Sequence, residues 1–171
     1  MGSGSASSGI FVALEGIEGA GKTSQLVRLA ERLRGLGREP VVVREPGGTP
    51  VAEAARQLIL HAPHDLSAAS ELFLFLTARA DLVERVIRPA LESGQVVLAD
   101  RFELSTRCYQ VAGRGLDLAR VEGAIALATG GLQPDLYVVL DIPVEAGQAR
   151  QAAEGKAPDK IARADTGFHR R

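Results

Sequence analysis

The sequence predicts an α/β fold in which one parallel β-sheet carries helices on both of its faces. Short apolar runs rich in β-branched residues alternate along the chain with segments of helical periodicity. The apolar runs are unbroken, which is typical of parallel strands, because neither face of such a sheet meets water. The chain has 171 residues, the length of one domain, and contains no internal repeat. We therefore predict a single domain.

Four strands and six helices are expected in alternation. The strands are predicted at residues 10–14, 40–44, 95–99 and 136–140. The helices are predicted at residues 22–36, 51–60, 67–91, 104–112 and 118–129, and from about residue 144 onward. Pro89 is expected to kink or shorten the end of the longest helix, because proline lacks the N–H that a helix interior needs.

The loop between the first strand and the first helix fits the phosphate-binding pattern G-x-x-x-x-G-K-[ST]. Its residues are Gly16, Ile17, Glu18, Gly19, Ala20, Gly21, Lys22 and Thr23. Glycines let backbone N–H groups point at phosphate oxygens, next to the positive end of the following helix. Lys22 is expected to reach the β- and γ-phosphates, and the Thr23 hydroxyl to ligate Mg²⁺. The alternative is a glycine-rich turn without a ligand, but the strand–loop–helix context favours a nucleotide site.

Asp100 ends the third expected strand and is the second candidate ligand for Mg²⁺. A carboxylate at the carboxyl edge of a parallel sheet can hold the metal directly or through water. The alternative is an aspartate that caps the next helix, and the neighbouring phosphate loop favours the metal role.

Composition excludes several classes of protein. The net charge of −1 does not favour a nucleic-acid partner, and no apolar run approaches the roughly 20 residues that span a membrane. Cys108 is the single cysteine, so no disulfide framework is possible, and the three histidines do not form a metal cluster. Residues 1–9 lack the apolar core of a signal peptide and are expected to be a flexible tail or an expression remnant. We therefore expect a cytoplasmic protein.

The phosphate loop alone does not identify the phosphate acceptor. The chain contains no asparagine, which excludes the Asn-Lys-x-Asp guanine reader of GTPases. A small domain with many arginines and a basic segment near its end favours a kinase of a small phosphorylated acceptor. Phosphoryl transfer depends mainly on positioning and on neutralising negative charge.

Four motifs give the chain a specific resemblance over residues 10–153. They are the phosphate loop at 16–23, R-E-P-G-G-T at 44–49, F-L-F-L-T-A-R at 73–79, and D-R-F at 100–102 followed by Ser105, Thr106, Tyr109, Gln110 and G-R-G at 113–115. With these motifs the sequence resembles the bacterial thymidylate kinases. The resemblance implies transfer of the γ-phosphoryl group of Mg-ATP to dTMP, which gives dTDP and ADP on the route to dTTP.

The resemblance also implies how the thymine base is bound. Phe75 and Arg79 lie four residues apart, on one face of a helix. In the family the matching phenylalanine stacks on thymine and the matching arginine bonds an exocyclic oxygen of the base. Phe75 could instead be a core residue of an apolar run. Four further residues match positions around the acceptor, although the three that are short polar helix residues could equally be structural: Pro46, Ser105, Thr106 and Gln110.

Four residues match family positions around the phosphate and sugar of dTMP. Arg101 and Arg56 correspond to arginines that bind the acceptor phosphate, and guanidinium groups suit phosphate because they can donate two parallel hydrogen bonds. Arg56 could alternatively be an exposed helix charge. Glu18 corresponds to the acid that meets the 3′-hydroxyl, and Tyr109 to the residue that crowds the 2′ position and favours deoxyribose.

A basic lid over ATP is implied at about residues 150–163. The phosphate loop contains no arginine, so the lid is expected to supply the positive charge between the two substrates. The candidate cations are Arg150, Lys156, Lys160 and Arg163, and the first three join Lys22 and Arg101 in the expected catalytic set. Lys160 stands where the family usually has an arginine, and lysine is a point charge without the planar fork of arginine.

The complete prediction is a P-loop NTPase-type parallel sheet of strand order 2-3-1-4, within a single domain at residues 10–171. The resemblance implies a fifth strand beyond this chain, so the C-terminus is expected to be truncated. It also implies a homodimer through the helix that holds Phe73. The alternatives are a kinase of another nucleoside monophosphate or of a deoxynucleoside, and, if the chain is truncated, a non-catalytic nucleotide-binding module.

Overall fold

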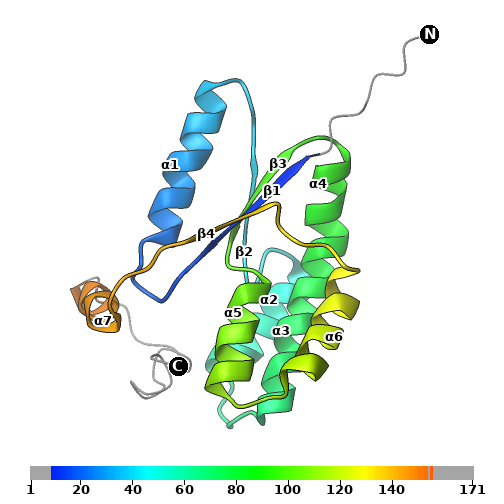
Figure 1. The fold of residues 1–171 in the computed structure, drawn as a ribbon, viewed down its shortest axis with the longest axis vertical. Helices are drawn as coiled ribbons and strands as arrows, with labels where there is room; N and C mark the ends of the chain where they lie inside the picture. Colours follow the sequence, from blue (N-terminus) through cyan, green and yellow to red (C-terminus); the bar gives the residue numbers. More distant parts are fainter. Residues whose placement is uncertain (1–8, 154, 156–171) are drawn as a thin grey trace.

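A parallel four-stranded sheet forms the centre of the molecule (Figure 1). The computed structural model describes residues 9–153 and 155. The strands are β1 (Ile10–Glu15), β2 (Val41–Arg44), β3 (Val96–Asp100) and β4 (Leu136–Val139), in the spatial order β2-β3-β1-β4. All three strand pairs are parallel. The predicted fold class and strand order are confirmed.

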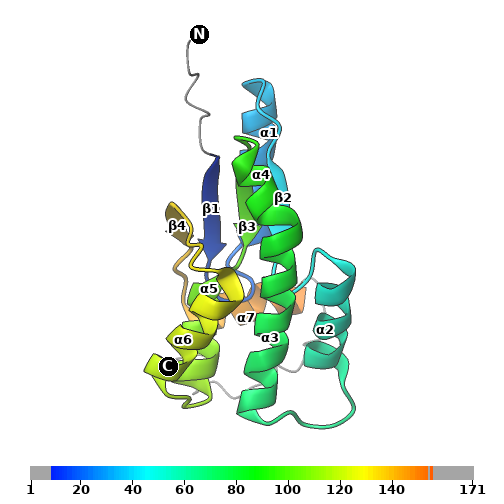
Figure 2. The same cartoon turned by 90° about the vertical axis from the view of Figure 1, so that its right-hand side faces the viewer.

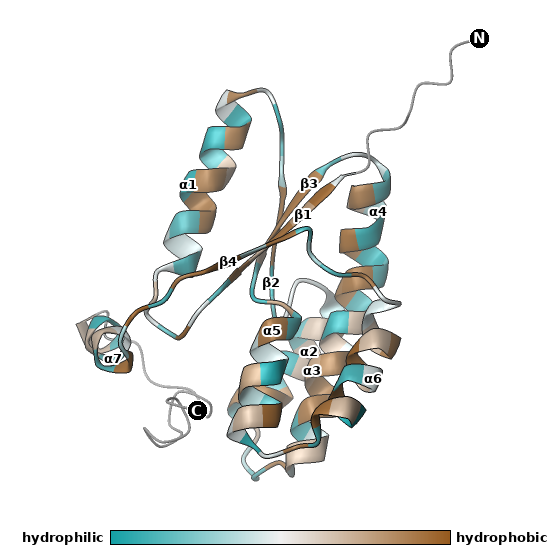
Figure 3. Ribbon diagram, viewed as in Figure 1, coloured by the Kyte–Doolittle hydropathy of each residue, from teal (hydrophilic) through white to brown (hydrophobic). Residues whose placement is uncertain are grey.

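The two central strands, β1 and β3, are buried on both faces, as their unbroken apolar runs predict, whereas the edge strands β2 and β4 keep exposed residues. Phe11 and Ala13 of β1 belong to a cluster with the long helix that follows α2, whereas Val12 and Leu14 pack against α1 (Lys22–Gly35). Successive residues of a strand point to opposite faces, so one apolar run serves two cores. In Figure 3, β1 and β3 are hydrophobic along most of their length, whereas α1 alternates between hydrophobic and hydrophilic residues.

Most of the remaining helices lie toward the carboxyl ends of the strands, whereas α4 (Arg88–Glu92) lies beside the beginning of β1 (Figures 1 and 2). The remaining helices are α2 (Pro50–His61), α3 (Ala68–Leu82), η1 (Val83–Ile87), α4, α5 (Glu103–Thr106), η2 (Arg107–Gly113), α6 (Leu118–Thr129) and α7 (Val144–Ala153), of which η1 and η2 are π-helical. No helix in the described part of the chain combines the length and apolarity needed to cross a membrane.

Pro89 does not shorten the long helix, so that part of the expectation was wrong. The segments α3, η1 and α4 follow one another without a break and form one column in Figure 2. The π-helical turn lies directly before the proline, and the N–H of Arg88 donates to the carbonyl of Val83, five residues back. Such a turn is wider than an α-turn. It gives the pyrrolidine ring room that a regular α-helix would not provide, and the helix continues to Glu92.

Candidate active site

The phosphate loop connects β1 to α1 at the carboxyl edge of the sheet. Gly16, Gly19 and Gly21 have φ angles of 140°, 75° and 97°, which residues with a side chain rarely adopt. Gly21 is the N-cap of α1 and supplies no side-chain cap, and the first turn of α1 contains no acidic residue. The N–H groups of this turn and the positive end of the helix therefore suit an anion such as a phosphate.

Lys22 lies buried at the base of this loop. Its ammonium donates hydrogen bonds to the carbonyl oxygens of Gly16 and Ile17, both at 2.9 Å. Burial, together with the positive charge of Arg101, lowers the pKa of Lys22 to about 8. A group with this pKa stays cationic near neutrality, and an anionic ligand would stabilise its charge further.

Thr23 and Asp100 come together as predicted. The Thr23 hydroxyl donates to Oδ2 of Asp100 at 2.7 Å, and both residues line the same pocket. These oxygen donors fit Mg²⁺, which prefers hard oxygen ligands and usually completes its octahedron with water and substrate phosphates. The described residues contain no cluster of three or more metal-binding side chains, so a metal here would need ligands from the nucleotide.

Arg101 lies at the centre of a charged cluster beside the loop. Its Nη2 donates to Glu18 at 2.5 Å, and its Nη1 donates to the Gly16 carbonyl at 3.1 Å. The guanidinium also lies over the ring of Tyr109, 5.4 Å from its centroid. The Tyr109 hydroxyl is 3.2 Å from each oxygen of the Glu18 carboxylate. Burial opposes ionisation of Glu18, but the charge of Arg101, a backbone hydrogen bond, the charge of Lys22 and the hydrogen bond from Tyr109 together lower the pKa of Glu18.

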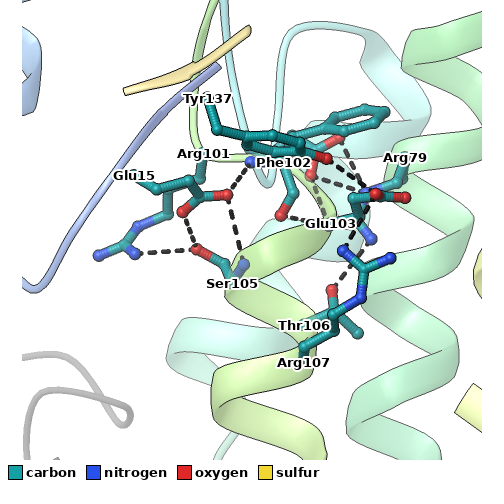
Figure 4. Close-up of polar contacts among 10 residues, drawn as sticks. Glu15, Arg79, Arg101, Phe102, Glu103, Ser105, Thr106, Arg107 and Tyr137 are labelled. Carbon is teal, nitrogen blue, oxygen red and sulfur yellow. Dashed lines mark hydrogen bonds and ion pairs between the residues drawn. The ribbon is translucent and has the colours of Figure 1, made fainter. Parts of the chain in front are cut away.

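Arg79 lines the same pocket, where a buried ion pair fixes it and where Thr106 and Phe102 accept further hydrogen bonds from it (Figure 4). Its guanidinium lies 2.6 Å from Glu45, and the two side chains are 2% and 5% exposed. It also donates to the Thr106 hydroxyl at 2.9 Å and to the Phe102 carbonyl at 3.1 Å. Of the five N–H groups of an arginine, these contacts leave one on Nη1 for a further acceptor. Burial raises the pKa of Glu45, against the opposing charge of Arg79.

One pocket of about 360 Å³ joins these two groups of residues. Its lining includes all of the residues predicted to contact dTMP: Glu18, Pro46, Arg56, Phe75, Arg79, Arg101, Ser105, Thr106, Tyr109 and Gln110. Gly19, Lys22, Thr23 and Asp100 line the same pocket. The structure therefore brings the two predicted halves of the site together.

Several predicted polar residues also have structural partners. Arg56 donates to the Pro46 carbonyl at 2.8 Å, which holds the guanidinium beside the loop that follows β2. Gln110 is buried, and its amide donates to Glu71 at 2.9 Å. Thr106 accepts from Arg79. These contacts favour a positioning role for Gln110 and Thr106 in addition to any contact with a ligand.

The lid residues are only partly described. Arg150 lies on α7 and donates to the Gly19 carbonyl of the phosphate loop at 3.2 Å. Lys156, Lys160 and Arg163 lie outside the described residues. The helix α7 approaches the loop closely, because a Cβ atom on Gly147 would lie 2.5 Å from the Glu18 carbonyl oxygen. The pocket is also lined by Gln151 of α7.

Sequence reasoning missed two acidic residues that organise the pocket, Glu15 and Glu45. Glu45 lies within the R-E-P-G-G-T motif, whose pattern gives no sign of a buried partner. Glu15 ends an apolar strand, and an acidic residue in that position is a signal that identifies it as a candidate.

Comparison with known proteins identifies the family. The family model described as thymidylate kinase matches residues 14–171. The chain belongs to the thymidylate kinase family. A thymidylate kinase of Deinococcus radiodurans is 47% identical over 165 residues, which span 96% of this chain and 80% of that protein. One from Pseudomonas putida is 52% identical over 151 residues, 87% of this chain and 71% of that protein.

A solved thymidylate kinase has the same fold. The crystal structure of the enzyme from Ehrlichia chaffeensis superposes with a TM-score of 0.74 at 34% identity, over 84% of this chain and 78% of that one. The predicted resemblance is thus confirmed for both sequence and fold.

Proposed function

We propose that this protein transfers the γ-phosphoryl group of ATP to dTMP, which forms dTDP and ADP in dTTP biosynthesis. Membership of the thymidylate kinase family supports this reaction. The observation that carries the residue roles is the single pocket in which a phosphate loop faces a cluster of acceptor-side arginines. The two parts are adjacent, as direct transfer between two bound substrates requires.

ATP is proposed to bind with its phosphates in the loop at residues 16–23. The N–H groups of the loop and the Lys22 ammonium would hold the β- and γ-phosphates. Thr23 and Asp100 would hold Mg²⁺, which supplies charge neutralisation to the phosphates when it is bound. The 2.7 Å contact between their side chains supports a shared role.

The acceptor phosphate is proposed to bind between Arg101 and Arg56. Arg101 lies against the phosphate loop through Gly16 and Glu18, so a phosphate on this guanidinium would lie next to the donor. A phosphate oxygen that is already ionised needs no general base, so positioning and positive charge account for the catalysis. Arg150, Lys156 and Lys160 are proposed as the lid cations that stabilise charge between the substrates.

The nucleoside of dTMP is proposed to lie between Phe75, Arg79 and Tyr109. Phe75 would stack on the base, since an aromatic face suits a planar ring. The remaining N–H on Nη1 of Arg79 would donate to an exocyclic oxygen of the base. Glu18 would meet the 3′-hydroxyl, and the Tyr109 ring would crowd the 2′ position.

A homodimer in the cytoplasm, where ATP and dTMP occur, completes the proposal. The helix α3 carries Phe73 with 62% of its surface exposed, and Leu127 on the neighbouring α6 is 86% exposed. An apolar surface of this kind favours a second copy of the chain as its partner. Analytical ultracentrifugation of the wild type and of a Phe73→Asp variant would test the homodimer. A monomeric wild type would contradict it.

The first test is a coupled assay of ADP release with Mg-ATP and a panel of acceptors. The panel comprises dTMP, dUMP, dCMP, AMP, GMP and thymidine. We expect a rate with dTMP, a weaker one with dUMP and none with the others. A preference for AMP, GMP, dCMP or thymidine would assign the protein to another class of kinase. ATP binding without turnover on any acceptor would favour a non-catalytic nucleotide-binding module.

A further inference from the structure

The carboxylate of Glu15 connects the end of β1 to the turn that carries Arg101 (Figure 4). Glu15 is only 3% exposed, and its oxygens accept hydrogen bonds from Phe102 and Ser105. The backbone N–H of Phe102 donates to Oε1 at 2.8 Å, and that of Ser105 donates to the same oxygen at 3.3 Å. The Ser105 hydroxyl donates to Oε2 at 2.7 Å. One buried side chain thus holds the beginning of α5.

The backbone of Arg101 needs such support. Its φ angle of 74° makes Arg101 the only residue other than glycine with positive φ in the described part of the chain. A side chain in this conformation is strained, and it persists only where the surroundings define it strongly. The N–H of Arg101 donates to the Leu14 carbonyl at 2.9 Å, on one side of Glu15. Phe102, on the other side of the strained residue, is held by the Glu15 carboxylate.

The same network reaches the guanidinium of Arg101. The Ser105 hydroxyl, which donates to Glu15, accepts from Nη1 of Arg101 at 3.0 Å. Nη1 also donates to the carbonyl of Gly16, the residue next to Glu15 in the chain. Both the backbone and the side chain of Arg101 are therefore fixed relative to residues 14–16, where the phosphate loop begins.

We propose that Glu15 is a positioning residue that sets Arg101 against the phosphate loop, so that the acceptor phosphate lies in line with the donor. Glu15 is not among the residues that line the described pocket. It acts through Phe102 and Ser105. The inference rests on the proposed role of Arg101 as the acceptor-phosphate arginine. The inference extends the role of Arg101, because it names Glu15 as the group that fixes the position of the Arg101 guanidinium.

Two conservative variants of Glu15 distinguish a positioning role of its carboxylate from a purely electrostatic role. Glu15→Asp keeps the negative charge but shortens the side chain by about 1.5 Å, which takes its oxygens out of hydrogen-bond range of Phe102. Glu15→Gln keeps the length and an oxygen acceptor for the two N–H groups but removes the charge. A positioning role predicts that the aspartate variant is the more damaged. A purely electrostatic role predicts the reverse order.

The measurements are kcat and KM for dTMP, together with the Kd of a fluorescent ATP analogue. Glu15→Asp is expected to lower kcat/KM for dTMP about 30-fold, because small misplacements of reacting groups cost large factors. Glu15→Gln is expected to lower it by less than about fivefold, and the Kd for the ATP analogue should stay within about twofold in both variants. Glu39→Asp, in an exposed ion pair with Arg34, is the matched control and should behave as the wild type.

An Arg101→Ala variant separates failure of this inference from failure of the proposed function. If Arg101→Ala leaves KM and kcat for dTMP unchanged, both are overturned. If it impairs dTMP turnover but Glu15→Asp does not, or if Glu15→Gln is the worse of the two, only the role of Glu15 is overturned. Equal losses for ATP and dTMP would also overturn it, because they indicate general damage.

Ser105→Ala provides a second route if Glu15→Asp does not fold. It removes the hydroxyl link between Glu15 and Arg101 and leaves the buried carboxylate its two N–H donors. The expected result is a several-fold loss of kcat/KM for dTMP with unchanged ATP affinity. In the double variant with Glu15→Gln, the loss of kcat/KM should be smaller than the product of the losses in the two single variants. Wild-type kinetics, or fully multiplicative effects, would overturn the proposal.

Discussion

The two sides of the pocket are held in place by different kinds of interaction. On the acceptor side, buried or half-buried ion pairs fix the side chains, as between Arg79 and Glu45 and between Arg101 and Glu18. On the donor side, the glycine-rich backbone of residues 16–23 forms the site, and the charged side chain that approaches it from α7, Arg150, makes an exposed contact.

This difference follows from what each side is proposed to bind. A nucleoside monophosphate must be distinguished from similar molecules, and rigid, paired side chains do this well because they cost little to organise at the moment of binding. A triphosphate offers many equivalent oxygens, which backbone N–H groups can bind without choosing between bases. We therefore expect changes on the acceptor side to affect dTMP, and changes on the donor side to affect ATP.

The largest effect is expected from Lys22→Met on the donor side. This change keeps the approximate length of the side chain and removes the charge proposed to stabilise the transferred phosphoryl group. We expect kcat to fall by about a thousandfold, as in other losses of transition-state stabilisation. Steady-state kinetics would measure the change, with a thermal unfolding curve as the control for folding. A loss below about tenfold would contradict the role of Lys22.

Arg79→Ala is expected to have the next largest effect, on the acceptor side. It removes the guanidinium proposed to read the base and leaves Glu45 buried without its partner. We expect kcat/KM for dTMP to fall about 100-fold, with ATP affinity within about twofold. The free energy of unfolding should fall by about 3 kcal/mol, the typical cost of breaking a buried pair.

The matched control for Arg79→Ala is Arg34→Ala, which breaks the exposed pair with Glu39. Exposed pairs contribute little to stability, so this variant should keep wild-type stability and kinetics. Equal losses of ATP and dTMP affinity in Arg79→Ala, measured by titration with each nucleotide, would end the assignment of Arg79 to the base.

The pH dependence of binding should also differ between the two sides. The pKa of Lys22 is lowered to about 8, so its ammonium deprotonates as the pH rises through that value. Only the charged ammonium of Lys22 pairs with phosphate. Above pH 8, therefore, Lys22 must take up a proton when ATP binds. The Kd for ATP should therefore rise by up to about tenfold per pH unit above pH 8.

Binding of dTMP should lack this dependence, because the acceptor-side arginines remain charged throughout. Calorimetric titrations at pH 7, 8 and 9 would measure both nucleotides. The Lys22→Met variant should lose the dependence for ATP, and persistence of the pH effect in that variant would assign it to another group.

A smaller effect is expected from Gly147→Ala in α7. The added Cβ would lie 2.5 Å from the Glu18 carbonyl oxygen, so α7 must move away from the phosphate loop. We expect KM for ATP to rise about threefold to tenfold, with a weaker effect on dTMP. Gly123→Ala in α6 is the control, because its Cβ would meet nothing within 4 Å. It should leave the kinetics unchanged and add about 0.5 kcal/mol of stability.

If Gly147→Ala instead changed KM for dTMP more than KM for ATP, α7 would belong to the acceptor side. The division of the pocket into a donor side and an acceptor side would then have to be redrawn.

Much of the fold could be predicted because its signals are local. The apolar runs of β1 and β3 and the helical spacing in α1 are properties of contiguous residues, and they placed these elements to within a residue or two. The π-helical turn at 83–87 could not be predicted, since an apolar helical pattern does not distinguish a five-residue from a four-residue turn. Its presence is what allows the helix to continue past Pro89.

The sequence by itself determined the phosphate loop and the parallel sheet, and its motifs selected the residues proposed to surround the acceptor, which line one pocket. The sequence alone shows these features because the loop needs closely spaced glycines and the strands need consecutive apolar side chains. Only the tertiary structure decided that Glu45 pairs with Arg79, that Glu15 holds the turn of Arg101, and that Gly147 packs against the loop. These partners are far apart in the chain, and a charge or a glycine carries no local sign of its distant partner. The packing of helices onto the sheet brings them together, and it thereby sets the geometry on which the chemistry depends.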